Sequence, residues 1–209
     1  MNAADRWEDA RRIESWAGEV RVNLIRLAGI LAFYGHHLVN VYFFRDDPSI
    51  RGQYHATVTA LTLLWGGEVM VLYFCLLRRW VPPGLKYAAT FTDLALITAL
   101  LTVADTPRSP LVVLYFVVIA SAPLRLSLRL VYAATLGAMV AYLFALGYYA
   151  FFAIGAERYY GEPNLRIPRT HEIILLLGLG AAGLLSGQVV RQVRRLVDGY
   201  SVAVGTRGE

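Results

Sequence analysis

The sequence predicts an all-α, polytopic membrane protein with six transmembrane helices and an N-terminal amphipathic surface helix. Hydrophobic residues make up 57% of the 209 positions and charged residues 17%, whereas soluble domains average about 45–50% and about 25%. Six apolar runs approach the length of about 20 residues that a helix needs to cross the hydrocarbon core. None of the runs alternates with a period of two. Since backbone groups in lipid must find partners within their own segment, helices are expected.

The first element is expected to be a helix within residues 1–22 that lies on the membrane surface. Ile13, Trp16, Ala17 and Val20 share one face at the spacing of an amphipathic helix. Acidic residues near its start suit the positive end of the helix dipole. Tryptophan at headgroup level is typical of interfacial helices. The alternative is that these residues extend the first membrane span into the cytoplasm.

The apolar runs predict a transmembrane bundle over residues 23–192. They cover residues 24–44, 56–77, 87–104, 110–122, 130–154 and 172–190. The fourth run is short because Pro110 and Pro123 bound it. Its helix is therefore expected to begin earlier, to tilt, or to continue past Pro123. Residues 193–209 are expected to form a cytoplasmic tail.

The distribution of basic residues predicts which side of the membrane each loop faces. Fourteen of the 20 Lys and Arg residues fall on the side of the two termini, and six fall on the other side. Arg26 and Arg125 are counted among the fourteen. Because positive charge collects in short cytoplasmic loops, both termini are expected in the cytoplasm. The protein is then expected to be a multi-pass component of a cytoplasmic (inner) membrane. Arg191, Arg194 and Arg195 after the sixth run are expected to contact anionic lipid.

The four histidines are the first candidates for a ligand site. His36 and His37 belong to the outer half of the first span, whereas His55 and His171 open the second and sixth spans. Imidazoles on facing helices bind haem iron or other metals, and they also form hydrogen bonds with quinones. A haem pair needs matched depth, which favours His55 with His171. The alternative is that His55 and His171 cap the interface while His36 and His37 form hydrogen bonds inside the bundle.

Two acidic residues inside the apolar runs are the second candidates. Glu68 lies near the middle of the second span, and Asp93 lies in the inner half of the third. Ionisable side chains are costly in lipid, so both are expected to face the bundle interior at similar depth. They predict either a proton-responsive or polar ligand site, or protonated acids that join helices by hydrogen bonds. No Lys or Arg is expected at that depth, so a buried ion pair is not predicted.

Aromatic and small residues indicate how the helices pack. Tyr34 and Tyr115 belong to a group of aromatic residues near the outer boundary. This group predicts an interfacial belt or a stacking site for a flat ligand such as a quinone. The sixth run contains small residues that allow close helix approach, either within the bundle or in a dimer. These are Gly178, Gly180, Gly183 and Gly187.

Residues 93–134 read DLALITALLTVADTPRSPLVVLYFVVIASAPLRLSLRLVYAA. Asp93, Thr98, the outer loop 105–108 and the pair Ser109-Pro110 resemble the six-helix membrane input modules of bacterial sensor histidine kinases, of the redox-responding and pilus-regulating types. The ending GLLSGQVVRQVRRL resembles their sixth span and its basic exit. The resemblance implies a sensory architecture. The Gly-Gly turn usual in that outer loop is missing, which counts against the quinone-sensing role of the redox-responding type.

The expected function is that of a non-enzymatic membrane subunit. The sequence has no phosphate loop, nucleophile elbow or zinc-protease helix, and its one cysteine excludes a disulfide framework. No kinase core follows the sixth run, so a module of this kind would signal through a separate output protein. The prediction is a subunit that packs against and organises partner membrane proteins, or a stand-alone sensory-type module. The alternative is a quinone- or haem b-binding redox protein that uses the outer-side histidines.

Overall fold

The computed structural model describes residues 3–43, 48–80, 82, 84–104, 109–162, 164–165 and 167–205, and this part of the chain is helical with short turns and no strand. The helices are α1 (Ala3–Phe43), α2 (Pro48–Leu77), α3 (Leu85–Val103), α4 (Val113–Ser121), α5 (Leu128–Tyr148), α6 (Ala156–Gly161) and α7 (Arg169–Gly205). Two 3-10 turns, η2 (Pro110–Val112) and η3 (Ala122–Arg125), flank α4. One π-helical turn, η4 (Tyr149–Ala153), ends α5.

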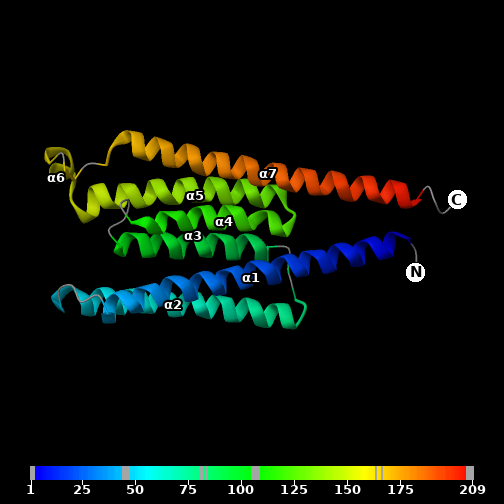
Figure 1. Ribbon diagram of the computed structural model, residues 1–209, viewed down its shortest axis with the longest axis horizontal. Helices are drawn as coiled ribbons and strands as arrows, with labels where there is room; N and C mark the ends of the chain where they lie inside the picture. The colour runs from blue at the N-terminus through cyan, green and yellow to red at the C-terminus, as the bar shows by residue number, and fades with distance from the viewer. Residues whose placement is uncertain are drawn as a thin grey trace.

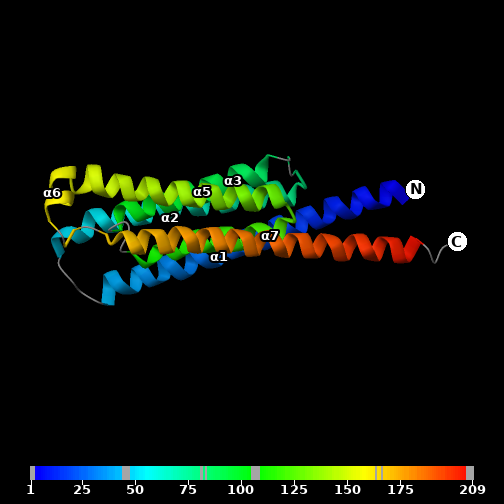
Figure 2. The same cartoon turned by 90° about the horizontal axis from the view of Figure 1, so that it is seen from above.

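The long helices lie side by side in one elongated bundle and alternate in direction (Figure 1). Both chain ends lie at the same end of the bundle, which we call the terminal end, and α6 lies at the opposite, far end (Figures 1 and 2). In both views α1 and α7 extend past the other helices at the terminal end. The most extensive packing joins α1 to α2, α5 to α7 and α3 to α5.

Five helices in the described residues are long and apolar enough to cross a membrane. They are Trp16–Phe43, Gly52–Leu77, Leu85–Val103, Leu128–Ala153 and Arg169–Leu196. This confirms the prediction of an all-helical chain with several membrane-spanning candidates, but not the number six. The fourth apolar run folds as the shorter segment Pro110–Arg125, which continues past Pro123 through the turn η3.

The separate surface helix predicted within residues 1–22 is not confirmed, because α1 is uninterrupted from Ala3 to Phe43. Trp16 Nε1 donates a hydrogen bond to the Leu76 carbonyl at the end of α2, at 3.0 Å. A Cβ at Gly18 would overlap with the Leu124 carbonyl oxygen, so α1 and η3 are in close contact. The start of the first span is thus packed on the bundle. Ile13 lies outside the residues whose side chains are described. α7 likewise runs to Gly205 with no break at residue 193.

The bundle has an apolar centre and a largely apolar surface. The centre is formed by α3, α4, α5 and α7, with Leu101, Tyr115, Ile119 and Leu179 fully covered. Large apolar side chains also point outward along the spans, among them Leu63, Phe74, Leu136, Phe144 and Leu185. An apolar surface of this extent fits contact with lipid or with other membrane proteins better than contact with water.

The glycines of α7 differ in what they pack against. A Cβ at Gly183 would overlap with the Thr135 side chain of α5, and one at Gly187 would touch Tyr132 at 3.4 Å. One at Gly178 would lie 3.3 Å from Phe116 of α4, whereas Gly180 has open space. Gly178, Gly183 and Gly187 therefore serve packing within the bundle, which is one of the two predicted roles. Gly180 does not.

Candidate functional site

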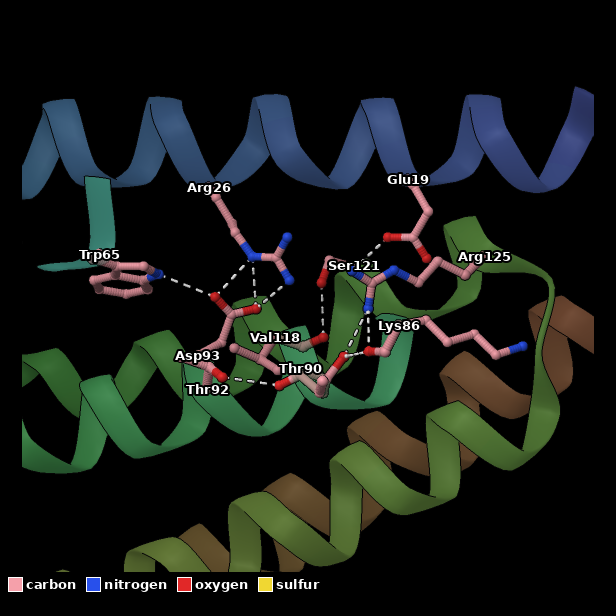
Figure 3. Close-up of polar contacts among 11 residues, drawn as sticks. Glu19, Arg26, Trp65, Lys86, Thr90, Thr92, Asp93, Val118, Ser121 and Arg125 are labelled. Carbon is pink, nitrogen blue, oxygen red and sulfur yellow. Dashed lines mark hydrogen bonds and ion pairs between the residues drawn. The ribbon is translucent and has the colours of Figure 1, made fainter. Parts of the chain in front are cut away.

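A buried ion pair joins the first and third spans. Arg26 Nε lies 2.7 Å and 2.8 Å from the two carboxylate oxygens of Asp93, and Arg26 Nη2 lies 2.6 Å from Oδ2 (Figure 3). The two side chains are only 5% and 7% exposed. The prediction that no basic residue lies at the depth of Asp93 is therefore wrong. Arg26 was counted among the basic residues on the side of the two termini, but its long side chain reaches the Asp93 carboxylate from α1.

Asp93 also accepts a hydrogen bond from the second span. Trp65 Nε1 donates to Asp93 Oδ1 at 3.0 Å. Asp93 thus joins three helices, since the indole comes from α2 and the guanidinium from α1 (Figure 3). Charged and polar donors of this kind offset the cost of burying a carboxylate.

A second buried ion pair lies closer to the terminal end. Arg125 Nη2 lies 2.9 Å from Glu19 Oε2, with both side chains at most 6% exposed. Arg125 Nη1 donates to Thr90 Oγ1 at 2.7 Å and to the Lys86 carbonyl at 3.1 Å (Figure 3). Arg125 was counted among the basic residues on the side of the two termini. It is instead a buried connection from η3 to α1 and α3.

Helical spacing explains how the sequence brings these groups together. Glu19, Asn23 and Arg26 follow one another at four and three residues and share the bundle-facing side of α1. Thr90 and Asp93 share one face of α3 in the same way. This spacing is the signal that could have revealed the site. It went unused because Glu19 and Arg26 stand at the polar border of an apolar run.

The turn after α4 connects both projecting helices. We call residues 124–126 the corner. Its Arg125 pairs with Glu19 of α1, and its Leu126 carbonyl accepts a hydrogen bond from Arg194 Nη2 of α7 at 2.7 Å. Leu126 adopts the left-handed conformation, with φ 49°, which ends η3 and turns the chain into α5. Nearby, Arg191 Nη2 of α7 donates to the Tyr132 hydroxyl at 2.6 Å.

Several polar atoms beside the first ion pair have no hydrogen-bond partner among the described residues. These are Arg26 Nη1, Asn23 Oδ1 and both carboxylate oxygens of Glu68, all of them buried. Asn23 uses only its Nδ2, which donates to the Val69 carbonyl at 3.2 Å. Glu68 and Asp93 were predicted to face the interior near each other. Trp65 lies one helical turn before Glu68 in α2, and its hydrogen bond to Asp93 agrees with that prediction.

The outer-side histidines separate into one pair and two single residues. His37 Nε2 and His55 Nδ1 lie 3.1 Å apart, and their rings stack with centroids 5.3 Å apart. The Tyr34 ring stacks on His37, and its hydroxyl shares a hydrogen bond with Thr59 Oγ1 at 3.2 Å. His55 of α2 thus contacts His37 of α1, whereas the haem pair favoured from the sequence was His55 with His171. Among the described residues no group of three or more His, Cys, Asp or Glu side chains could hold a metal ion.

An apolar pocket of about 520 Å³ opens beside α7 at the start of that helix. Its walls come from η2, α4, the segment before α7 and the first turns of α7, and include Ser109, Phe116, Ile167, His171 and Leu175. Tyr115, predicted as a ligand contact, is not in its lining. That side chain is fully buried, and its hydroxyl bonds Thr98 Oγ1 at 2.9 Å. His36 is exposed, and the outer loop 105–108 lies outside the described residues.

Comparison of the chain with protein-family models, with curated proteins and with solved structures finds no match in any of the three. The resemblance to the membrane input modules of sensor histidine kinases therefore stays a prediction. The candidate site rests on its geometry alone. It consists of two buried ion pairs, Arg26–Asp93 and Arg125–Glu19, and of the Glu68 carboxyl group, which has no hydrogen-bond partner among the described residues.

Proposed function

We propose that the protein is a non-enzymatic, multi-pass membrane module that transmits a change inside its bundle to a partner protein through α1 and α7. The output surface is the terminal end, where both helices extend past the rest of the bundle (Figures 1 and 2). Projecting helices of this kind suit contact with a separate output protein or with other subunits of a membrane complex. The same module would serve as a packing and organising subunit if its partner were another integral membrane protein.

The observation that carries the proposal is the corner, residues 124–126. It bonds α1 through Arg125 and Glu19, and it bonds α7 through the Leu126 carbonyl and Arg194. A displacement of α4 or η3 would therefore act on both projecting helices at once. Coupling of this kind is expected to pass through a contiguous set of packed and bonded groups. Here one ion pair and one hydrogen bond, made by the adjacent residues Arg125 and Leu126, connect α1 to α7.

We further propose six membrane crossings, with the segment Pro110–Arg125 as the fourth. At about 1.5 Å per residue its 16 residues span about 24 Å, which local thinning of the bilayer around this short segment can accommodate. An even number of crossings agrees with chain ends that lie at one end of the bundle. The excess of basic residues on that side favours the cytoplasm of a bacterial cell, with the module in its inner membrane.

The transmission proposal can be tested by distance measurements between α1 and α7. Cys75 is the only cysteine, so Cys75→Ser provides a background without reactive thiols. Spin labels at Arg12→Cys and Asp198→Cys then report the separation of the projecting ends by pulsed electron paramagnetic resonance in nanodiscs. We expect Arg125→Gln to broaden or shift the distance distribution. Arg158→Gln, in an exposed ion pair, is the matched control and should leave it unchanged. An unchanged distribution in Arg125→Gln would contradict the coupling.

A second candidate function is binding of a quinone in the pocket beside α7. Its apolar walls fit a quinone ring with a short isoprenoid chain, and His171 provides one hydrogen-bonding group in the lining. A short-chain ubiquinone should bind the wild-type protein, and His171→Phe should weaken binding about fivefold, since one hydrogen bond contributes about 1 kcal/mol. His36→Phe is the control. Binding that is equal in all three proteins would exclude His171 as the contact. A visible spectrum with a Soret band would favour haem b instead.

A further inference from the structure

Five ionisable side chains meet in the buried site, and they do not balance in charge. Arg26 pairs with Asp93, and Arg125 pairs with Glu19. The fifth group, Glu68, has no cationic nitrogen within 4 Å among the described residues. Each positive charge is thus already committed to one carboxylate, and Glu68 is the carboxyl group left over.

The atoms around Glu68 lack hydrogen-bond donors. Within the described part of the chain, both of its carboxyl oxygens are buried without a hydrogen-bond partner, and so is the Oδ1 of Asn23 across the α1–α2 contact. The Asn23 amide contacts α2 at the residue after Glu68, since its Nδ2 donates a hydrogen bond to the carbonyl of Val69. Among the described residues the first ion pair offers one buried donor without a hydrogen-bond partner, Arg26 Nη1, against these three acceptor oxygens. The other such donors of the site, Nε and Nη2 of Arg125, belong to the second ion pair, where Nη2 lies 2.9 Å from Glu19. One added hydrogen on Glu68 would supply a donor where acceptors are in excess.

The charges that act on Glu68 come from each element packed near it. Asp93 of α3 opposes a negative charge on Glu68, whereas Arg26 of α1 and Arg125 of η3 favour one. Both arginines already hold a closer carboxylate, so their attraction is largely compensated. A bare carboxylate in the apolar interior of a bundle is costly unless it is paired.

We propose that Glu68 is the proton-binding site of this bundle: it holds a proton in the resting protein, and its ionisation redirects Arg26. On release the carboxyl O–H bond breaks, its electron pair stays on oxygen, and the proton passes to water. The new carboxylate then attracts the unpartnered Nη1 of Arg26 and competes with Asp93 for the guanidinium. The assignment of Glu68 as the proton-binding site does not depend on the output function proposed for α1 and α7.

Infrared spectroscopy of the full chain in nanodiscs of neutral lipid tests the assignment. The wild-type protein should show the C=O stretch of a protonated carboxylic acid at neutral pH, and this band should disappear as the pH is raised. Glu68→Gln should lack the band. Glu157→Gln removes an exposed glutamate and is the matched control, which should retain the band. Absence of the band in the wild-type protein, or its persistence in Glu68→Gln, would overturn the proposal.

A stability measurement gives a second readout. The thermal midpoint of the wild-type protein should fall over the same pH range in which the C=O band disappears. Glu68→Gln should not show this fall. Stabilisation of the wild-type protein by sodium ions at fixed pH, absent in Glu68→Gln, would identify a metal cation as the ligand and would reject the proton. Should Glu68→Gln not fold, Glu68→Asp keeps the acid and must shift the frequency of the same band. An unshifted band would count against Glu68.

Discussion

Arg26 and Asp93, 67 residues apart in the chain, form an ion pair through three contacts of 2.6–2.8 Å inside the bundle. The pair fixes α1 against α3, two helices that are not neighbours in sequence. Arg26 presents two of its three nitrogens to the carboxylate, a geometry that lysine could not reproduce. The remaining nitrogen, Nη1, is buried and without a hydrogen-bond partner in the described part of the chain.

Removal of one partner of this pair is expected to destabilise the protein strongly. Arg26→Gln leaves Asp93 as an unpaired buried charge, and we expect a loss of about 3–5 kcal/mol in the free energy of unfolding. Asp93→Asn should cost a similar amount, while the double variant should recover a large part of the loss, because it leaves no bare charge. Denaturant titration in detergent, followed by tryptophan fluorescence, measures the three values.

The exposed pair Arg158–Glu162 provides the control for that series. Its side chains are 71% and 54% exposed, and the atoms lie 3.5 Å apart. Arg158→Gln should change the free energy of unfolding by about 0–1 kcal/mol. Equal effects of Arg26→Gln and Arg158→Gln would mean that the buried pair does not hold the helices.

Gly183 and Gly180 should respond oppositely to alanine. A Cβ at Gly183 would overlap with Thr135, so Gly183→Ala must displace α7 from α5 and lower the thermal midpoint. Gly180 has open space around its Cα, so Gly180→Ala should be neutral or stabilising by up to about 1 kcal/mol through helix propensity. Thermal unfolding in detergent compares the two variants. If Gly183→Ala alters only oligomeric state and not the midpoint, the glycine serves a dimer instead.

Two buried tyrosines offer a comparison of hydroxyl groups. Tyr115 shares a hydrogen bond with Thr98, whereas the Tyr142 hydroxyl is buried without a partner among the described residues. Tyr115→Phe should cost about 1 kcal/mol. Tyr142→Phe should be neutral or stabilising, since it removes an unsatisfied polar group. The free energies of unfolding of both variants decide this, and a larger loss in Tyr142→Phe would indicate a partner such as a bound ligand.

Topology reporters test whether the segment Pro110–Arg125 crosses the membrane. A reporter fused after residue 126 should be active in the same compartment as one at either terminus, and a reporter fused after residue 106 should be active in the opposite compartment. The reason is that α3 and α4 run in opposite directions in the bundle (Figure 1). Reporters at residues 106 and 126 that read the same compartment would leave five crossings and contradict the sixth.

Much of the architecture was predictable from run length and composition. Apolar runs such as 56–77 and 172–190 can be recognised locally, because a segment in lipid must satisfy its own backbone and must be apolar along its length. The interior orientation of Asp93 followed from the same reasoning, since an ionisable group in lipid needs shelter. The packing roles of Gly183 and Gly187 were one of two predicted alternatives, and their contacts with α5 decide between them.

The partners of the buried charges could not be predicted in this way. Arg26 and Arg125 stand at the edges of apolar runs, where sequence reasoning assigns basic residues to the lipid surface, and only the packing of α1 against α3 and η3 turns them inward. His37 likewise meets His55 because α1 and α2 are antiparallel neighbours. Hydropathy is a property of each segment alone. Charge pairing depends on helix rotation and register, which arise only when the whole bundle packs together.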